Sequence, residues 1–256
     1  MNKFPALRLQ PVTSAFQFRQ FKVSQHRSAM KVGTDGVLLG AWAELHNSGQ
    51  ASEHCQILDI GSGTGLIALM LAQRFPTATI AAVELDAAAA EEAALNFSES
   101  PWANRLSLYH GDIGKFRSAE LFDLVVANPP FFVESLHGPD AARNAARHTE
   151  TLTSQQLLRS VDCLLADQGT FCAIVPWQQH SAVIHLAAKH NLHVAKICSV
   201  QPTPQKSAHR TLLSFQRNTV EAPERSQLVV ELSRHNYSAE FRELTKAFYL
   251  RSGQQP

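Results

Sequence analysis

The chain has 256 residues, of which 45% are hydrophobic and 18% are charged, a composition typical of one large globular domain. No apolar run approaches the roughly 18 residues of a membrane span, and the N-terminus lacks the basic and apolar pattern of a signal peptide, so we expect a cytoplasmic protein that does not contact a membrane. The net charge of +1 excludes a strongly basic nucleic-acid-binding domain, so any contact with RNA or DNA must be local.

The N-terminal part of the sequence predicts a hairpin and a helix. Residues Phe16 to Val23 alternate apolar and polar side chains, which indicates a half-exposed strand in a lid or small hairpin. The segment Met30 to Gly36 leads into a helical run over Val37–Ala43, and Thr34 or Asp35 is placed to cap that helix. Because a helix start can present a hydroxyl and backbone amides to a carboxylate, this segment is a candidate for ligand contact.

A glycine-rich turn is the feature around which the sequence is organised. The apolar strand Ile57–Ile60, which contains Asp59, ends at Gly61-Ser62-Gly63-Thr64-Gly65, and a helical run begins at Leu66. Glycines let the backbone approach a ligand closely, and a helix start leaves N–H groups unpaired. The glycines are spaced two apart, unlike those of the dinucleotide fingerprint G-x-G-x-x-G. The pattern D-x-G-x-G-x-G resembles motif I of the class I S-adenosylmethionine-dependent methyltransferases; a structural turn and a site for another nucleotide are the alternatives.

Acidic residues follow the next two predicted strands. The strand Thr79–Val83 ends at Glu84, roughly 20 residues after the glycines, where a carboxylate can accept hydrogen bonds from both ribose hydroxyls of a nucleotide. The strand Leu106–His110 ends at Gly111, Asp112 and Ile113. Open α/β sheets bind ligands at the C-terminal ends of their strands. These residues therefore predict one ligand site at one edge of a parallel sheet.

A fourth strand, Leu121–Ala127, ends at Asn128, Pro129, Pro130 and Phe131, which we call the N-P-P-F turn. The prolines lack N–H donors and have a fixed φ, so the turn is stiff and presents hydrogen-bond acceptors. The Asn128 side chain and the Pro129 carbonyl could accept both protons of an exocyclic amine and draw its lone pair out of ring conjugation. Phe131 would stack on the base. An ordinary loop-closing turn is the alternative.

The C-terminal half alternates helices and strands, which predicts a doubly wound, mostly parallel sheet. The predicted elements are a helix over Ser154–Leu165, a turn at Gly169, a strand over Thr170–Val175, a helix over Trp177–His190, a strand over His193–Val200, a loop over Pro202–Ala208, closing strands over Thr211–Gln216 and Leu228–Leu232, and a terminal helix over Ala239–Leu250.

Local clusters of basic residues are the candidate RNA contacts, although each cluster alone is more typical of a solvated surface. They are Lys22, Arg27 and Lys31 before the first helix, Arg143, Arg147 and His148 after the N-P-P-F turn, and Lys206, His209 and Arg210 in a late loop.

Cysteine and histidine spacing predicts no metal site. The four cysteines, Cys55, Cys163, Cys172 and Cys198, form no C-x-x-C pair, and no histidine lies at ligand spacing from them. We expect all four to be reduced core residues.

Taken together, the motifs resemble one family over nearly the whole chain. They are F-x-F-R-Q-F-K from Phe16, M-K-V-G-T-D-G-V-L-L-G-A-W from Met30, the glycine-rich turn, V-E-L-D, the N-P-P-F turn, A-R-H and the C-terminal F-R-E-L-T-K-x-F-Y-L. In this combination the chain resembles the bacterial tRNA1(Val) (adenine(37)-N6)-methyltransferases.

The resemblance implies an α/β, doubly wound Rossmann-like methyltransferase sheet of seven mostly parallel strands with an antiparallel last hairpin. It also implies S-adenosyl-L-methionine as cofactor, an adenine of a tRNA anticodon stem-loop as acceptor, and direct methyl transfer. We divide the chain into an N-terminal extension or lid (1–30), the methyltransferase domain (31–250) and a flexible tail (251–256), and we expect a monomer without a metal.

The family's functional residues map onto this sequence by their motifs. Gly33, Thr34 and Asp35 would lie at the methionine end of the cofactor, with Asp59, Gly61, Ser62, Gly63 and Gly65 in the glycine-rich turn, Glu84 at the ribose, Leu85, Asp112 and Ile113 at the adenine, and Asn128 with Pro129, Pro130 and Phe131 in the acceptor site.

Other assignments stay open because the central motifs are shared. A DNA N6-adenine enzyme would carry a target-recognition insertion, and a guanine-N2 enzyme often has a duplicated N-terminal domain; this chain has no room for either. A protein-glutamine methyltransferase would use the same N-P-P-F turn. A non-catalytic RNA-binding module is the alternative from another class, and the intact Glu84 and Asn128 argue against it.

Overall fold

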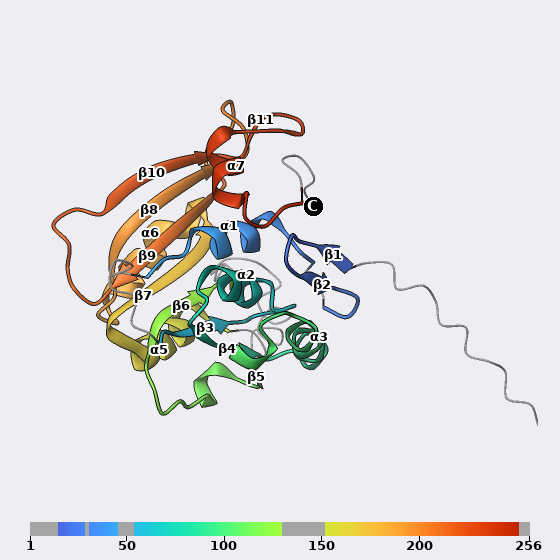
Figure 1. The fold of residues 1–256 in the computed structure, drawn as a ribbon. Coiled ribbons are helices and arrows are strands. Elements are labelled where there is room, and N and C mark those ends of the chain that lie inside the picture. Colours follow the sequence, from blue (N-terminus) through green and yellow to red (C-terminus); the bar gives the residue numbers. More distant parts are fainter. Residues whose placement is uncertain (1–14, 29–30, 46–53, 130–151, 251–256) are drawn as a thin grey trace, which may run out of the picture.

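An eight-stranded sheet forms the centre of the computed structural model, which describes residues 15–28, 31–45, 54–129 and 152–250 (Figure 1). Seven strands are mutually parallel, and β9 runs antiparallel to both of its neighbours. From edge to edge the strands are β10 (Glu224–Val229), β8 (His193–Gln201), β9 (Arg210–Gln216), β7 (Leu165–Pro176), β6 (Phe122–Ala127), β3 (Gln56–Ile60), β4 (Thr79–Glu84) and β5 (Leu106–His110).

The predicted fold class is confirmed. The seven expected strands are present, and the hairpin of β8 and β9 supplies the expected antiparallel strand, which inserts between β7 and β8. An additional strand, β10, pairs parallel with β8 and forms the edge of the sheet. The predicted closing strand over Leu228–Leu232 is instead divided between the end of β10 and a small hairpin of β11 (Glu231–Ser233) and β12 (Asn236–Tyr237).

Helices cover both faces of the sheet (Figure 1). One face carries α1 (Thr34–Trp42), α2 (Leu66–Arg74), α3 (Ala87–Ser98) and α7 (Ala239–Thr245), and the other carries α5 (Ser154–Leu164) and α6 (His180–Ala188). Short 3₁₀ turns are η1 (Ala103–Arg105), η2 (Ile113–Lys115) and η3 (Trp177–Gln179).

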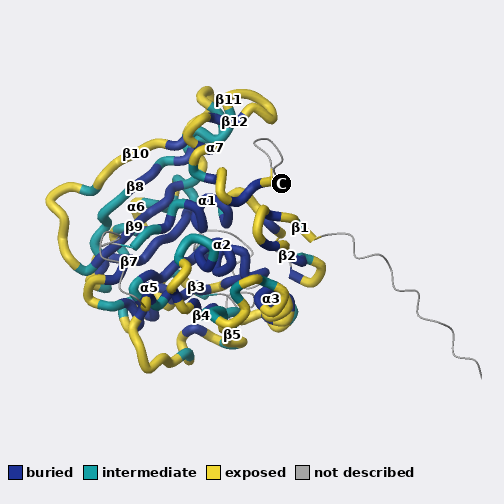
Figure 2. Tube along the Cα trace, in the orientation of Figure 1, coloured by how far each residue is buried: buried dark blue, intermediate teal, exposed yellow. Residues whose placement is uncertain are grey.

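The central strands are buried on both faces, as Figure 2 shows. In β6, Leu124 and Val126 join the core beneath α1 and α2, whereas Val125 and Ala127 join the core beneath α5. Side chains of successive strand residues point to opposite faces, so one apolar strand supplies two hydrophobic cores. This explains why the strand sequences read as continuous apolar runs.

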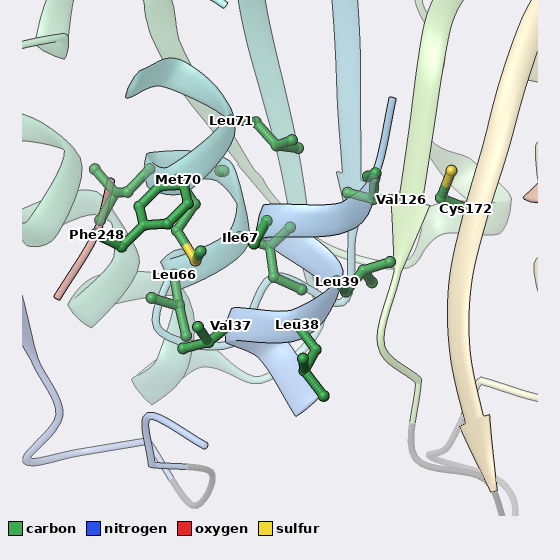
Figure 3. Close-up of a cluster of buried hydrophobic side chains, with 14 of the residues drawn as sticks. Val37, Leu38, Leu39, Leu66, Ile67, Met70, Leu71, Val126, Cys172 and Phe248 are labelled. Atoms are coloured by element: carbon green, nitrogen blue, oxygen red, sulfur yellow. The ribbon is translucent and has the colours of Figure 1, made fainter. Parts of the chain in front are cut away.

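Two glycines let α1 pack closely against α2. A Cβ atom at Gly36 would lie 3.1 Å from Leu66 Cδ2, and one at Gly40 would lie 2.8 Å from Met70 Sδ. Figure 3 shows the apolar side chains of the two helices, including Leu66 and Met70, gathered in this contact. Because Leu66 is the first residue of α2, the close packing brings the start of α1 to the glycine-rich turn.

The predicted N-terminal hairpin is confirmed and is packed into the core. It consists of β1 (Ala15–Gln17) and β2 (Lys22–Ser24), and the Phe18 side chain between them is fully buried. Phe18 stacks on Tyr249 with ring centroids 5.9 Å apart, and the Arg19 backbone N–H donates to the Phe248 carbonyl at 2.8 Å. These contacts join the two ends of the described chain.

Buried Asn96 of α3 joins the hairpin to the glycine-rich turn. Its side-chain oxygen accepts a hydrogen bond from the Ser24 N–H at 2.8 Å, and its amide donates to the carbonyls of Ser24 at 3.0 Å and Thr64 at 2.9 Å. Nearby, the buried Glu92 carboxylate accepts hydrogen bonds from the backbone N–H groups of residues 26–28.

Four further local predictions are wrong. Neither Thr34 nor Asp35 caps α1, whose N-cap is Gly33 without a side-chain hydrogen bond. The helix α7 ends at Thr245 instead of Leu250. Cys163 is exposed, whereas the other cysteines are buried, and all four are free thiols as expected.

The fourth correction concerns Gly169, which was expected to be a turn between a helix and a strand. The strand β7 begins at Leu165, directly after α5, and bulges between Leu165 and Thr170, the partners of Phe122 and Leu124. Gly169 lies within this bulge, where a Cβ would stand 2.8 Å from the Phe122 carbonyl oxygen. The glycine therefore permits close backbone approach and does not end the strand.

We predict that Asn96→Ala destabilises the protein by ~2–4 kcal/mol, because three buried backbone groups lose their partner. Urea unfolding measures this change. Ser98→Ala is the matched control, since Ser98 is exposed on the same helix and bonds only the Leu95 carbonyl; it should change stability by less than about 0.5 kcal/mol. Equal stabilities of the two variants would contradict the role of Asn96.

Candidate functional site

The glycine-rich turn forms an open loop between β3 and α2. Gly61, Gly63 and Gly65 have φ values of 70°, 55° and 79°, a region that side-chain-bearing residues rarely adopt. A Cβ at Gly61 or Gly63 would meet nothing within 4 Å, whereas one at Gly65 would lie 2.4 Å from the Phe97 ring. The first two glycines thus border open space, and the third packs against α3.

Glu84 connects the end of β4 to this turn. Its Oε2 accepts a hydrogen bond from the Gly63 N–H at 2.7 Å, and its Oε1 accepts one from the Asp86 N–H at 2.9 Å. Each carboxylate oxygen has two lone pairs, so both can accept a further hydrogen bond from a ligand. Glu84 is half-buried, which leaves part of the carboxylate accessible.

Asp59 holds the start of α2 from inside the protein. Its side chain is fully buried, and Oδ2 accepts a hydrogen bond from the Ala68 N–H at 3.1 Å. Ala68 is the third residue of a helix whose N-cap, Gly65, has no side chain, so Asp59 supplies the capping acceptor. Burial raises the pKa of Asp59 to about 7, and the negative charge of Glu84 adds to this increase.

Two buried oxygens beside the turn lack a protein partner. They are Asp59 Oδ1 and Ser62 Oγ. Buried polar groups in proteins are nearly always hydrogen-bonded. The fold uses neither of these two oxygens, so both are available at the turn for a hydrogen bond to a bound molecule.

Exposed apolar surface and a second carboxylate lie along the same edge. Leu85 is 48% exposed and Tyr109 is 40% exposed. Asp112 is the N-cap of η2, and its Oδ1 accepts a hydrogen bond from the Gly114 N–H at 2.8 Å. Ile113 is buried. A flat ligand could cover the apolar surface while its polar edge meets Asp112.

The start of the N-P-P-F turn lies next to the glycine-rich turn. Ile60 of β3 pairs with Ala127 of β6, so Gly61 and Asn128 follow at the same level on neighbouring strands. The strand order reverses between β3 and β6, and open sheets bind ligands at such a switch point. Asn128 is half-buried and Pro129 is buried. Pro130 and Phe131 lie outside the described residues.

The start of α1 is tied to the start of β9 at this edge. Asp35 Oδ2 accepts a hydrogen bond from Arg210 Nε at 2.8 Å, and both side chains are about one-third exposed or less. Gly33 and Thr34 are exposed beside this ion pair. Asp35 was a candidate cofactor contact and Arg210 a candidate RNA contact, so the structure joins two residues that the sequence assigned to different ligands.

The other basic candidates are dispersed. Lys22 pairs with Glu99 at 2.9 Å. Glu99 is the C-cap of α3, and this end of the helix is remote from the C-terminal ends of the strands, where the candidate site lies. Arg27 pairs with Glu91, and Lys31 donates to the Ser28 carbonyl at 3.2 Å. Lys206 and His209 are both exposed in the loop before β9. The predicted contacts Arg143, Arg147 and His148 lie outside the described residues.

Sequence reasoning missed Asn96, which bonds the Thr64 carbonyl and thereby fixes the glycine-rich turn. The available signal was a polar residue on the buried side of an alanine-rich helix. Within the described residues no group of three or more His, Cys, Asp or Glu side chains could hold a metal ion. The part of the chain described also contains no helix that is long and apolar enough to cross a membrane.

Comparisons with known proteins agree with this geometry. The model of the family named "Methyltransferase small domain" matches residues 43–176, a range that includes the glycine-rich turn and the N-P-P-F turn. The chain is 44% identical over 239 residues to the tRNA1(Val) (adenine(37)-N6)-methyltransferase of Parabacteroides distasonis, covering 92% of this chain and 98% of that protein. It is 46% identical over 239 residues to the enzyme of that name from Pectobacterium carotovorum, covering 92% and 93%.

Solved structures support the fold. A protein described as a predicted O-methyltransferase from Agrobacterium tumefaciens aligns with a TM-score of 0.61 at 18% identity, over 84% of this chain and 96% of the other. The methyltransferase subunit of a type I restriction-modification system from Streptococcus thermophilus aligns with a TM-score of 0.56 at 13% identity, over 86% and 52%. The architecture is that of class I S-adenosylmethionine-dependent methyltransferases.

The buried Asp59 predicts a pH-dependent stability. The folded protein holds this proton more tightly than the unfolded chain, in which the pKa is near 3.8. The contribution of Asp59 to the free energy of unfolding therefore falls as the pH rises from about 4 to about 7. Asp59→Asn keeps a hydrogen-bond acceptor for the Ala68 N–H and removes the charge. Its free energy of unfolding should therefore rise relative to that of the wild type across this pH range, by on the order of 1–4 kcal/mol. Above about pH 7 the difference should stay constant.

Urea unfolding at several pH values measures the difference. The exposed Asp167→Asn is the matched control, and its difference from the wild type should not grow over the same range. A constant difference between wild type and Asp59→Asn would show that Asp59 is charged throughout.

Proposed function

The chain belongs to the tRNA1(Val) (adenine(37)-N6)-methyltransferase family, and from this premise we propose that it transfers a methyl group from S-adenosylmethionine to N6 of adenine 37 in the anticodon loop of tRNA1(Val). The observation that carries the proposal is the register of Ile60 with Ala127. This register puts Gly61 of the glycine-rich turn and Asn128, the first residue of the N-P-P-F turn, side by side at the switch point of the sheet.

The residues at the turn fit S-adenosylmethionine. Gly61 and Gly63 have open space where a Cβ would stand, and Ser62 Oγ lacks a protein partner. Glu84 can accept from both ribose hydroxyls, and the exposed surface of Leu85 suits a purine. The residues that would hold the cofactor are Gly33, Thr34, Asp35, Asp59, Gly61, Ser62, Gly63, Gly65, Glu84, Leu85, Asp112, Ile113 and Asn128.

These residues contribute in two ways. Glu84, Leu85 and Asp112 retain accessible surface for direct contact. Asp59 has no exposed surface, so its side chain acts by holding the start of α2 and thereby the shape of the turn.

S-adenosylmethionine supplies an electrophilic methyl group when bound. The protein must prepare the adenine amine, which is a poor nucleophile because its lone pair is conjugated with the ring. The Asn128 side-chain oxygen and the Pro129 carbonyl accept hydrogen bonds from the two amine protons and turn the lone pair away from the ring. The amine becomes acidic as the methyl group arrives, so its proton can leave to water without a general base. Alignment of the reacting atoms supplies much of the acceleration.

We infer that the protein acts as a cytoplasmic monomer, because its tRNA substrate is cytoplasmic and one chain carries both turns. We propose residues 31–250 as the catalytic domain, with residues 1–30 and 251–256 as its N-terminal and C-terminal segments. Of the basic candidates, Lys206 and Arg210 lie at the catalytic edge and are the described residues that we assign to RNA contact, with Arg143, Arg147 and His148 as further candidates.

The mechanism predicts that Asn128→Ala lowers kcat by ~10²–10³, because an oriented polar group is lost from the transition state. Cofactor affinity should fall much less than kcat, because the other residues that would hold the cofactor are unchanged. Asn128→Asp keeps the acceptors and should retain partial activity. The measurement is methylation of a tRNA1(Val) transcript by purified protein, with mass mapping of the modified nucleoside.

Gln156→Ala is a control, since Gln156 lies outside the site. Its side chain accepts a hydrogen bond from the backbone N–H of Thr153, the N-cap residue of α5. Full activity of Asn128→Ala would overturn the mechanism. A methyl group on any atom other than adenine N6 would overturn the substrate assignment.

A further inference from the structure

Trp177 lies at the edge of the sheet that carries the glycine-rich turn and Asn128, where the parallel strands have their C-terminal ends. It has no role in the mechanism above. It follows Pro176, the last residue of β7, and β7 is the neighbour of β6. Ala127 pairs with Ala173, so Asn128 stands level with Ile174. Trp177 therefore stands three residues further along, roughly 10 Å beyond Asn128 in the strand direction.

The Trp177 ring is stacked on an imidazole. The ring centroids of Trp177 and His180 are 4.4 Å apart, with an interplanar angle of 26°. His180 Nδ1 lies 2.5 Å from the Trp177 carbonyl oxygen, which fixes the imidazole against the turn. Both side chains are half-buried, so the stacked pair keeps exposed surface.

The backbone at Trp177 is held independently of the ring. The Trp177 N–H donates to the His209 carbonyl at 3.0 Å, and Pro176 pairs with Arg210 in the sheet. A smaller side chain would leave both contacts in place. The fold therefore does not require a large aromatic ring to set this turn.

The chain around Trp177 carries no acidic residue. Residues 168–220 contain no Asp or Glu, although the whole chain has 22 in 256 residues, a frequency at which four or five are expected in such a stretch. This segment does contain Lys206 and His209 in the loop that contacts Trp177, and Arg210 at the start of β9. Asp35 reaches it from α1 and pairs with Arg210. A half-exposed aromatic pair beside cationic side chains suits a nucleic-acid strand.

We propose that Trp177, supported by His180, is a stacking platform for a second base of the substrate RNA, next to the methylated adenine. The loop that holds the Trp177 backbone through the His209 carbonyl also carries Lys206, so His209 and Lys206 are the side chains we assign to the flanking phosphates. Single-stranded RNA loops are bound by stacking of unpaired bases on aromatic rings, and such stacking tolerates different bases. This inference rests on the proposed function for the identity of the RNA.

The test compares Trp177→Ala, Trp177→Phe and the control Gln178→Ala, an exposed neighbour in the same turn, for binding of a tRNA1(Val) transcript and of S-adenosylmethionine. Loss of one stacked base costs ~1–3 kcal/mol, so Trp177→Ala should weaken tRNA binding roughly 5- to 150-fold. Trp177→Phe should lose less, because it keeps a π-face. Cofactor affinity and the melting temperature should match those of the control.

A fluorescence measurement decides the question even where Trp177→Ala fails to fold. In a variant with Trp42→Phe and Trp102→Phe, Trp177 is the single tryptophan. Its emission should be quenched by the tRNA and unchanged by the cofactor alone. Unchanged emission with bound tRNA, or tRNA affinity that is unaffected by Trp177→Ala, would overturn the platform.

The two proposals fail in different ways. Methylation of the transcript by the wild type together with unaffected tRNA affinity in Trp177→Ala overturns the platform and keeps the proposed function. Quenching by the tRNA without any methylation supports the platform and overturns the proposed function. An equal loss of cofactor affinity and tRNA affinity would assign Trp177 to the fold and overturn the platform.

Discussion

The hydrogen bond from Gly63 N–H to the Glu84 carboxylate is the interaction on which the site depends. It spans 2.7 Å and joins the loop after β3 to the end of β4. Glycines at positive φ have many alternative conformations, so the turn needs external partners to keep one shape. Glu84 supplies the first, and Asp59 supplies the second through Ala68 of α2. Asn96 supplies the third by donating to the Thr64 carbonyl. Three side chains from three elements therefore fix the shape of the glycine-rich turn.

Packing then brings the remaining parts of the site to this turn. Parallel pairing puts Asn128 level with Gly61, because Ala127 pairs with Ile60. The small size of Gly36 and Gly40 lets α1 lie against α2, which carries Asp35 to the same edge, where it pairs with Arg210 of β9. The candidate site is thus assembled from segments that are distant in sequence, and the antiparallel β9 extends this edge of the sheet toward the acid-free segment around Trp177.

The features that could be predicted from sequence are those set by local chemistry. The strands before Gly61 and Asp112 were located to within a residue, since both end at turn residues. The first is also a buried apolar run, whereas the second is the edge strand β5, which has no buried residue. The features that sequence did not reveal depend on distant partners. Nothing near Gly169 indicates that the Phe122 carbonyl approaches it. Nothing near Asp35 indicates that its side chain pairs with Arg210 and does not cap the N-terminus of α1. The ligand roles of the site residues stay predictions, because they concern contacts with molecules outside the fold.

Calorimetric titration of S-adenosylmethionine into wild type and Glu84→Ala tests most directly whether the carboxylate-held glycine turn is the cofactor site. Loss of charge-assisted hydrogen bonds at the ribose, together with release of Gly63, should weaken binding by ~1.5–3 kcal/mol, or roughly 10- to 150-fold. Glu91→Ala removes an equal charge from the exposed surface of α3 and should bind as tightly as the wild type. Cofactor affinity that is unchanged in a folded Glu84→Ala variant would contradict the account.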